Sequence, residues 1–334
     1  MRQAALVSIG SYVPPRRVSN DEICQKIDSS DEWIRTRTGI QYRHVADNGM
    51  VTSDLGAEAG ERALTALGSR DIDMVIVSTA TGDNFSPPTA PVVAHKLGLG
   101  GVPTFDVSAA CSGFVFGLAT TAGMVRGNLA NRVLFVSAET PYMFTDPHDR
   151  NTAPLFGDGA GAVVVAAETD PDAPGVIGAF DLGTDGSGID LVKIPGHGSR
   201  ARASGALLTE SRYITMNGRE LFVQAVTSME RSSRVAVAQA GLSLDDIDIV
   251  IAHQANRRII EAVADELEMD RKKFFINIGD NGNTLSASIP LALKEASDCG
   301  VLAAGHRVLI TAFGSGTSWG STVITWPDLP TSSS

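Results

Sequence analysis

The first candidate for chemistry in this chain is a cysteine set among small residues. Cys111 lies in the run SAACSG (108–113), after a short apolar stretch (104–107) and before a proline-free segment rich in Ala, Gly and Leu (114–124). This order predicts a strand, an elbow and a helix. In such an elbow the first N–H groups of the helix and its dipole favour the thiolate, the nucleophilic form of cysteine. The alternative is an inert cysteine buried beneath a helix of small residues.

Two further groups have side chains suited to chemistry. His253 directly follows the apolar run 249–252, and α/β folds place reactive groups at the carboxyl ends of buried strands. A histidine there can equally be a structural residue. Trp33, Arg35 and Arg37 lie within five positions before a glycine. Such a group can stack on an adenine ring and pair with phosphates, or it can form a solvated helix end.

An internal repeat indicates the elements that position these residues. The segment 71–77 (DIDMVIV) recurs at 246–252 (DIDIVIA), and the segment 132–136 (RVLFV) recurs at 307–311 (RVLIT). Both pairs have the same offset of 175 residues (246 − 71 and 307 − 132). Two matches at one offset indicate a duplication. Because a helical pattern comes before a buried strand in each half, we expect an α/β fold with mostly parallel sheets covered by helices on both faces.

The repeat divides the chain into two predicted halves, residues 1–175 with Cys111 and residues 176–334 with His253. Residues 185–212, rich in Gly, Ser and Arg, are predicted to be an irregular insertion, either a surface loop or a lid over a pocket. The offset carries Cys111 to Ser286, in the run GNTLSASIP (282–290), which is again small and polar before an apolar helix. This second elbow contains Asn283, a residue type that is also a common turn former.

Composition limits the classes of function. The 334 residues include 27 Lys and Arg and 38 Asp and Glu, and the net charge of −11 argues against a nucleic-acid partner. Three widely spaced cysteines indicate neither a disulfide framework nor a zinc site, so we expect no metal and a reducing, cytoplasmic location. No apolar run reaches membrane-spanning length, and the first residues do not fit a signal peptide, so no membrane association is expected.

Seven short motifs occur in an order that resembles one known family. They are DEWI (31–34), RTGI (37–40), AACSG (109–113), FGDGAGA (156–162), HQAN (253–256), GNT (282–284) and FGSG (313–316). The chain resembles the thiolase-like condensing enzymes, and among them the β-ketoacyl-acyl carrier protein synthase III group, which includes the priming ketosynthases of polyketide pathways. The resemblance implies a thiolase-like fold, a duplicated αβαβα architecture of five layers and a homodimer.

The same resemblance implies an activity and a catalytic triad of Cys111, His253 and Asn283. Cys111 would take a short acyl group from coenzyme A, since a thiolate exchanges acyl groups between thioesters. The acyl group would then condense with malonyl-acyl carrier protein as CO2 leaves, with His253 Nε2 and the Asn283 amide stabilising the enolate. The backbone N–H groups of Cys111 and Ser315 would form the oxyanion hole. The resemblance implies no permanently bound cofactor, since coenzyme A thioester is a substrate, and places the reaction at the start of fatty-acid or polyketide synthesis.

Residues outside the triad are also assigned by the resemblance. Trp33, Arg37 and Arg150 would contact coenzyme A, with the adenine between Trp33 and Arg150. Arg257 and Arg258 would dock the carrier protein. The helix that follows carries Asp265 and Glu266 where lysine is common in the family, and this leaves a different partner open.

A primer pocket is predicted at Phe85 and Ser86, in the segment NFSPP (84–88) that reaches across the dimer in this family. Ser86 stands where a bulky residue is common, which suggests a roomier pocket than acetyl needs, unless Phe85 fills the space.

Two other functions remain open from the sequence. An acyltransferase on the same scaffold would move an acyl or malonyl group to an alcohol or amine without forming a C–C bond. A non-catalytic synthase subunit is disfavoured by the presence of Cys111. A degradative thiolase is disfavoured because neither Cys24 nor Cys299 lies in the motif of a second catalytic cysteine.

Overall fold

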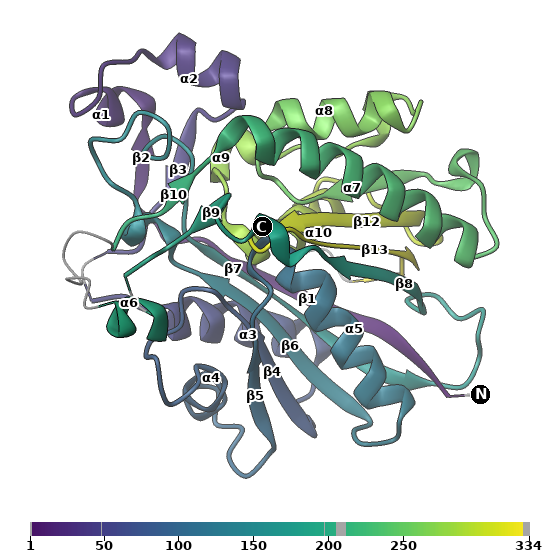
Figure 1. Ribbon diagram of the computed structural model, residues 1–334. Coiled ribbons are helices and arrows are strands. Elements are labelled where there is room, and N and C mark those ends of the chain that lie inside the picture. The colour runs from purple at the N-terminus through teal and green to yellow at the C-terminus, as the bar shows by residue number, and fades with distance from the viewer. Residues whose placement is uncertain (1, 48, 197, 205–211, 330–334) are drawn as a thin grey trace.

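Two main sheets, of five and four strands, are separated and flanked by helices (Figure 1). The structure is a computed structural model that describes residues 2–47, 49–196, 198–204 and 212–329. In order, the five layers are helices α3 and α4, the first sheet, helices α5 and α10, the second sheet, and helices α7 and α8. This is the duplicated αβαβα architecture that the resemblance implies.

The first sheet has the strand order β1-β7-β6-β4-β5. β4 runs parallel to β5 and β6, whereas β7 runs antiparallel to β6 and β1. All five residues of β4 are buried, as the apolar run predicts for a strand covered on both faces. The bounds are β1 (Gln3–Tyr12), β4 (Met74–Ser78), β5 (Thr104–Val107), β6 (Arg132–Glu139) and β7 (Gly159–Glu168).

The second sheet repeats most of this arrangement, with the order β11-β12-β13-β8. β11 is parallel to β12, and β13 is antiparallel to both β12 and β8. The bounds are β8 (Ile177–Thr184), β11 (Ile249–Ala252), β12 (Arg307–Gly314) and β13 (Ser318–Thr325). β11 and β12 begin 175 residues after β4 and β6, the offset found in the sequence. At the edge where β5 lies in the first sheet, the second has a single parallel bridge between Val250 and Phe274.

Three hydrophobic cores lie between the five layers. The central core joins both sheets through α5 and α10, with Phe114 and Leu118 on one helix and Ile289 and Leu293 on the other. The outer cores pack α3 and α4 on the first sheet and α7 and α8 on the second. The bounds are α3 (Thr52–Leu67), α4 (Ala90–Lys96), α5 (Gly113–Arg126), α7 (Gly218–Gln239), α8 (Arg257–Glu266) and α10 (Ser288–Asp298).

A small outlying region packs beside the layers near the entrance to the site. It contains β2 (Arg17–Ser19), α1 (Asn20–Cys24), α2 (Asp31–Thr38) and β3 (Tyr42–His44). α1 begins with a capping box between Ser19 and Glu22. The short helix α9 (Ile278–Asn281) lies against β3.

The predicted irregular insertion, residues 185–212, contains short regular elements. They are η3 (Gly186–Gly188), β9 (Val192–Lys193) and α6 (Ser199–Ala203), and β9 pairs with β10 (Thr215–Met216) just beyond the predicted end. Residues 197 and 205–211 of the predicted insertion lie outside the described residues. Further 3-10 turns elsewhere are η2 (Pro141–Phe144), η4 (Leu244–Asp246) and η5 (Arg271–Lys273).

Candidate active site

Cys111 lies on a tight elbow between β5 and α5. Ala110 has a left-handed backbone (φ 46°), and the short turn η1 (Ala110–Ser112) leads directly into α5 at Gly113. The end of β12 approaches this elbow so closely that a Cβ on Gly314 would lie 2.7 Å from Ser112 N and 2.9 Å from Cys111 N. Glycine at position 314 therefore allows the second sheet to contact the backbone that carries Cys111.

His253 is held on two sides just after β11. Its backbone N–H donates to the carbonyl of Thr311 on β12 (2.9 Å), and its ring Nδ1 lies 2.7 Å from Ser288 Oγ. The side chain is buried, and burial lowers the pKa of His253 to about 3. His253 is therefore a neutral imidazole at physiological pH, and Nε2 is the ring nitrogen left for the cavity.

Asn283 is fixed by contacts at both its backbone and its amide. Its backbone N–H donates to Leu155 O (2.8 Å), and its carbonyl accepts from Gly157 N–H (3.1 Å). The side-chain Oδ1 accepts from the backbone N–H of Leu285 (2.9 Å) at the turn η6 (Leu285–Ala287). Because Oδ1 is occupied, the NH2 group is the part of Asn283 left for the cavity.

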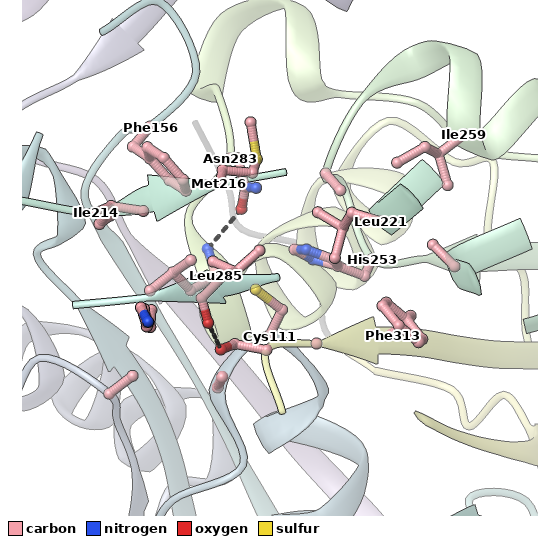
Figure 2. A pocket seen from close by; sticks show the side chains of 18 of the residues that line it. Cys111, Phe156, Ile214, Met216, Leu221, His253, Ile259, Asn283, Leu285 and Phe313 are labelled. Atoms are coloured by element: carbon pink, nitrogen blue, oxygen red, sulfur yellow. Dashed lines mark hydrogen bonds between the residues drawn. The ribbon is translucent and has the colours of Figure 1, made fainter. Parts of the chain in front are cut away.

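Cys111, His253 and Asn283 face one inner cavity of about 260 Å³ (Figure 2). They come from three different elements, and Figure 2 shows their side chains pointing into the same space. The rest of the lining is mainly apolar and includes Phe156, Ile214, Met216, Leu221, Ile259 and Phe313. The structure thus brings the three residues of the predicted triad together in a mainly apolar cavity.

The ionisation of Cys111 differs from the expectation for the elbow. Burial and the nearby carboxylate of Glu139 raise the pKa of the Cys111 thiol to about 12, although the backbone N–H groups of Cys111 and Ser315 act in the opposite direction. The expectation that the elbow favours the thiolate is therefore wrong. Cys111 is a thiol at physiological pH, because burial outweighs both backbone donors.

The backbone N–H groups of Ser315 and Cys111 both interact with the thiol of Cys111. The Ser315 hydroxyl is used elsewhere, since it donates to the carbonyl of Val192. That carbonyl belongs to β9, whose residues Val192 and Lys193 line the inner cavity together with Ile194. Part of the predicted insertion therefore forms a wall of the inner cavity.

An outer cavity of about 820 Å³ adjoins the inner one. Met216, Leu221, Ala255, Ile259 and Asn283 line both cavities, so the outer cavity leads to the triad. The predicted coenzyme A residues all line its walls: Trp33, Arg37 and Arg150. The Arg150 guanidinium lies 4.3 Å from the centroid of the Trp33 ring, and that of Arg37 lies 5.9 Å from it.

The two arginines predicted for docking lie on different surfaces. Arg258 lines the outer cavity, with its guanidinium 5.9 Å from the Phe222 ring. Arg257 instead packs against Gly39 and lines a separate hollow with Asp31 and Glu32. Arg219, a further arginine that could take part in docking, lies with Arg258 at the outer cavity.

Asp265 and Glu266 are the two acidic residues at positions where lysine is common in the family. Asp265 forms an exposed ion pair with Arg271 (2.5 Å between Oδ2 and Nη2). Glu266 accepts a hydrogen bond from Arg234 through its backbone carbonyl, not through its carboxylate.

The predicted primer-pocket residues do not line either cavity of this chain. Phe85 is 90% exposed, and Ser86 beside it is also exposed. Small residues that line the inner cavity with Cys111 include Ala80, Ala110 and Gly314.

Two buried polar residues near the triad were not found from the sequence. Ser288 contacts His253, and Glu139, the last residue of β6, accepts hydrogen bonds from Ser286 Oγ (2.6 Å), Thr81 Oγ1 (2.8 Å) and Ala80 N (3.1 Å). Burial raises the pKa of Glu139 to about 7. One signal was available: VLFVSAE (133–139) places a glutamate at the end of an otherwise apolar strand.

The described residues contain neither a candidate metal site nor a candidate membrane-spanning helix. Over residues 2–47, 49–196, 198–204 and 212–329, no group of three or more His, Cys, Asp or Glu side chains could hold a metal ion. In the same part of the chain, no helix has the length and apolar character needed to cross a membrane.

Family models and a known protein similar to this chain all belong to one family. Residues 105–186 match the family model "3-Oxoacyl-[acyl-carrier-protein (ACP)] synthase III", and residues 237–326 match the model of its C-terminal part. The chain is 47% identical over 329 residues to β-ketoacyl-[acyl-carrier-protein] synthase III 3 of Streptomyces coelicolor, which covers 98% of each chain.

Solved structures of similar proteins extend this relationship to the fold. One is the 3-oxoacyl-(acyl carrier protein) synthase III of Pseudomonas aeruginosa (41% identity, TM-score 0.92, 98% of this chain and 99% of that chain). Another is the priming β-ketosynthase of the R1128 polyketide biosynthetic pathway (37% identity, TM-score 0.92, 98% of both chains).

Proposed function

The chain belongs to the 3-oxoacyl-[acyl-carrier-protein] synthase III family, and on this premise we propose a role for each group in its active site. It is a condensing acyltransferase of the β-ketoacyl synthase III type. It loads a short acyl group from coenzyme A and condenses it with malonyl-acyl carrier protein to begin a fatty-acid or polyketide chain. The observation that carries the assignment is the convergence of Cys111, His253 and Asn283 on one mainly apolar cavity that adjoins a second cavity lined by arginines.

Loading is an exchange between two thioesters at Cys111. The cysteine sulfur bonds to the acyl carbonyl carbon, and the carbonyl oxygen becomes an oxyanion. The backbone N–H groups of Cys111 and Ser315 are the donors we assign to that oxyanion, which is supported by their interaction with the thiol. The C–S bond to coenzyme A then breaks, and the proton lost by Cys111 ends on the coenzyme A sulfur. His253 is not needed as a base in this exchange.

Condensation needs donors rather than a base. As the malonyl carboxylate leaves as CO2, the C–C bonding pair becomes an enolate whose oxygen carries the charge. His253 Nε2 and the Asn283 amide would stabilise that oxygen, because burial makes their hydrogen bonds strong. The enolate carbon then attacks the acyl-cysteine, and the Cys111 sulfur leaves as the thiolate and takes a proton from solvent.

Binding of both substrates is assigned to the outer cavity. Trp33, Arg37 and Arg150 would hold the adenine and phosphates of coenzyme A. The residues that line both cavities would guide the pantetheine arm to Cys111. Arg258, with Arg219 beside it, is the better candidate for carrier-protein docking, since Arg257 faces a different hollow.

The assembly and location are proposals of the same kind. We assign a cytoplasmic homodimer in which Phe85 and Ser86 enter the partner's primer pocket. Support comes from the exposure of Phe85, an aromatic side chain on a segment that contacts neither cavity of its own chain.

Intact-protein mass spectrometry with a panel of acyl-CoA thioesters tests the central assignment. The wild-type chain should gain the mass of one acyl group, and Cys111→Ala should gain none. Trp33→Ala should still be loaded, at higher acyl-CoA concentration, and serves as a folded control. A persistent adduct on Cys111→Ala would contradict the role of Cys111.

The division of labour is tested with His253→Ala and Asn283→Ala. Both variants should still load the acyl group, while release of CO2 from malonyl-acyl carrier protein falls by about 100-fold or more. If either variant loses loading instead, the assignment of these side chains to decarboxylation is wrong. Transfer of malonyl to an alcohol or amine without CO2 release would favour the acyltransferase alternative.

A further inference from the structure

A buried serine at the start of α10 makes two hydrogen bonds beside the catalytic histidine. Ser288 Oγ lies 2.7 Å from His253 Nδ1 and 3.2 Å from the backbone N of Gln254. Ser288, His253 and Gln254 are each at most 2% exposed. The direction of these two hydrogen bonds decides which nitrogen of the histidine carries its proton.

The backbone N–H of Gln254 fixes one direction, because it can only donate. Ser288 Oγ accepts that hydrogen bond, and its one hydroxyl hydrogen can be donated to one acceptor. If His253 Nδ1 also donated to Oγ, the serine hydrogen would need another acceptor. Within the described residues Ser288 Oγ has no further hydrogen-bond partner, and leaving a buried hydroxyl hydrogen unpaired is costly. The serine therefore donates to Nδ1, and the histidine hydrogen is on Nε2.

The partners of Ser288 are held in place by the surrounding backbone. The Gln254 side chain donates to Ala252 O (2.9 Å) and Phe275 O (3.2 Å) and accepts from Asn277 N (3.1 Å). These bonds fix the segment after β11, so the Gln254 N–H stays aimed at Ser288. The hydrogen bond that Ser288 accepts therefore comes from a fixed backbone N–H and not from a mobile side chain.

Ser288 belongs to the segment that orients the other donor. Leu285 N–H holds Asn283 Oδ1 and leaves the amide NH2 for the cavity, and three residues later Ser288 holds His253 Nδ1 and leaves Nε2–H. One short segment, residues 283–288, thus aims two neutral donors at the same cavity. Two donors are what an enolate oxygen requires, and the low pKa of His253 keeps its imidazole neutral.

We propose that Ser288 is a positioning residue that locks His253 in the tautomer with its proton on Nε2, so that His253 serves decarboxylation as a hydrogen-bond donor. This inference rests on the function proposed above. It adds a residue that does not touch substrate but determines what His253 can do. With the proton already on Nε2, that nitrogen cannot accept the proton of Cys111.

Nitrogen-15 NMR of histidine-labelled protein tests the tautomer without any substrate. The His253 signals, identified as those missing in His253→Ala, should show a protonated Nε2 and an unprotonated Nδ1 in the wild type. Ser288→Ala should give a mixture of tautomers, and Ser288→Thr, which keeps a hydroxyl group, should restore the wild-type pattern. Ser297→Ala, a buried serine on the same helix, is the matched control and should change nothing.

Kinetics of the acylated enzyme supply the second readout. In Ser288→Ala the rate of CO2 release at saturating malonyl-acyl carrier protein should fall roughly tenfold, because part of the histidine population presents no donor. KM and the rate of acyl loading on Cys111 should stay at wild-type values, since Ser288 touches neither substrate. Ser288→Thr should recover most of the rate.

The outcomes separate this inference from the proposed function. A proton on Nδ1 in the wild type, or an unchanged tautomer and CO2 release in Ser288→Ala, would overturn the role of Ser288. If the wild type releases no CO2 at all, the proposed function fails, while the spectrum of the wild type still decides whether Ser288 sets the tautomer.

Discussion

The two elbows of the molecule have nearly the same backbone and very different surroundings. Ala110 and Leu285, 175 residues apart, are both left-handed, with φ of 46° and 48°. Each is the first residue of a 3-10 turn of three residues, η1 or η6, which leads directly into a helix of the central layer, α5 in one case and α10 in the other. Such a conformation is uncommon for residues other than glycine, so its occurrence at both positions indicates that the duplication preserved the elbow geometry.

What differs is the residue supplied by the strand that faces each elbow. At the first elbow β12 ends in Gly314, which has no side chain, so the backbone N–H of the next residue reaches Cys111. At the second elbow β6 ends in Glu139, whose carboxylate accepts a hydrogen bond from Ser286, the counterpart of Cys111. The same backbone thus meets backbone donors at the elbow to which we assign the nucleophile, and a buried carboxylate at the other elbow.

The largest effect is expected from Gly314→Ala, which tests the glycine side of this comparison. The new methyl group would lie 2.7 Å from Ser112 N and 2.9 Å from Cys111 N, so the elbow or the strand has to move. Misplacing the oxyanion donors should slow acyl loading by about 100-fold or more, measured by mass spectrometry over time. Gly123→Ala, on α5 with open space around its Cβ position, is the control. Acyl loading at the wild-type rate in Gly314→Ala would show that the first elbow does not need a glycine at the end of β12.

A smaller effect, on stability, is expected from Glu139→Gln. The pKa of Glu139 is raised to about 7 from 4.5, so between those values the folded state binds this proton more tightly than the unfolded state. Stability contributed by the protonated form is therefore present below pH 4.5 and is lost as pH rises to 7, by up to about 3 kcal/mol. The glutamine variant should lack this part of the pH dependence.

Urea unfolding at pH 5 and pH 8 measures the difference between wild type and Glu139→Gln. Asp158, whose pKa is raised to about 6 by burial, contributes in the same direction in both proteins and cancels. Glu58→Gln, at an exposed position on α3, is the surface control. Equal pH dependence in Glu139→Gln and wild type would mean that Glu139 does not hold its proton as the buried site implies.

The smallest effect is expected when a cysteine is placed at the second elbow. In the double variant Cys111→Ala, Ser286→Cys, the new thiol is fully buried, does not line the cavity and faces Glu139. No acyl adduct should form with any acyl-CoA in the mass spectrum. An adduct on residue 286 would show that the elbow geometry alone is enough for reactivity.

Much of the fold could be predicted from the sequence because the repeat is strongest in buried strands. The strand predicted over 104–107 is β5, and the pairs 71–77 and 246–252 contain β4 and β11. Burial on both faces restricts these segments to apolar residues, so their similarity survives duplication. The boundary between residues 175 and 176 stays a prediction, and we propose it as the point of fusion, between β7 and β8.

Contacts between side chains far apart in the sequence could not be predicted in the same way. Hydrogen bonds such as Ser288 to His253 and Glu139 to Ser286 join residues 35 and 147 positions apart, and no local pattern marks them. The raised pKa of Cys111 could not be predicted either, because it depends on how deeply the layers bury the thiol. Arg257 and Arg258 are adjacent in sequence, yet their directions diverge with the turn of α8.

The stacking of Arg150 on Trp33 has a consequence for the affinity of coenzyme A. At 4.3 Å from the ring centroid, the guanidinium leaves no room for an adenine ring, which would need about 7 Å between its two neighbours. Binding as proposed must first separate this pair, which costs about 0.5–1 kcal/mol for an exposed cation–π contact. If adenine binds as proposed, it would compete with the Arg150 side chain. The apparent Kd for coenzyme A would then equal the intrinsic Kd divided by the fraction of molecules in which the pair is already open.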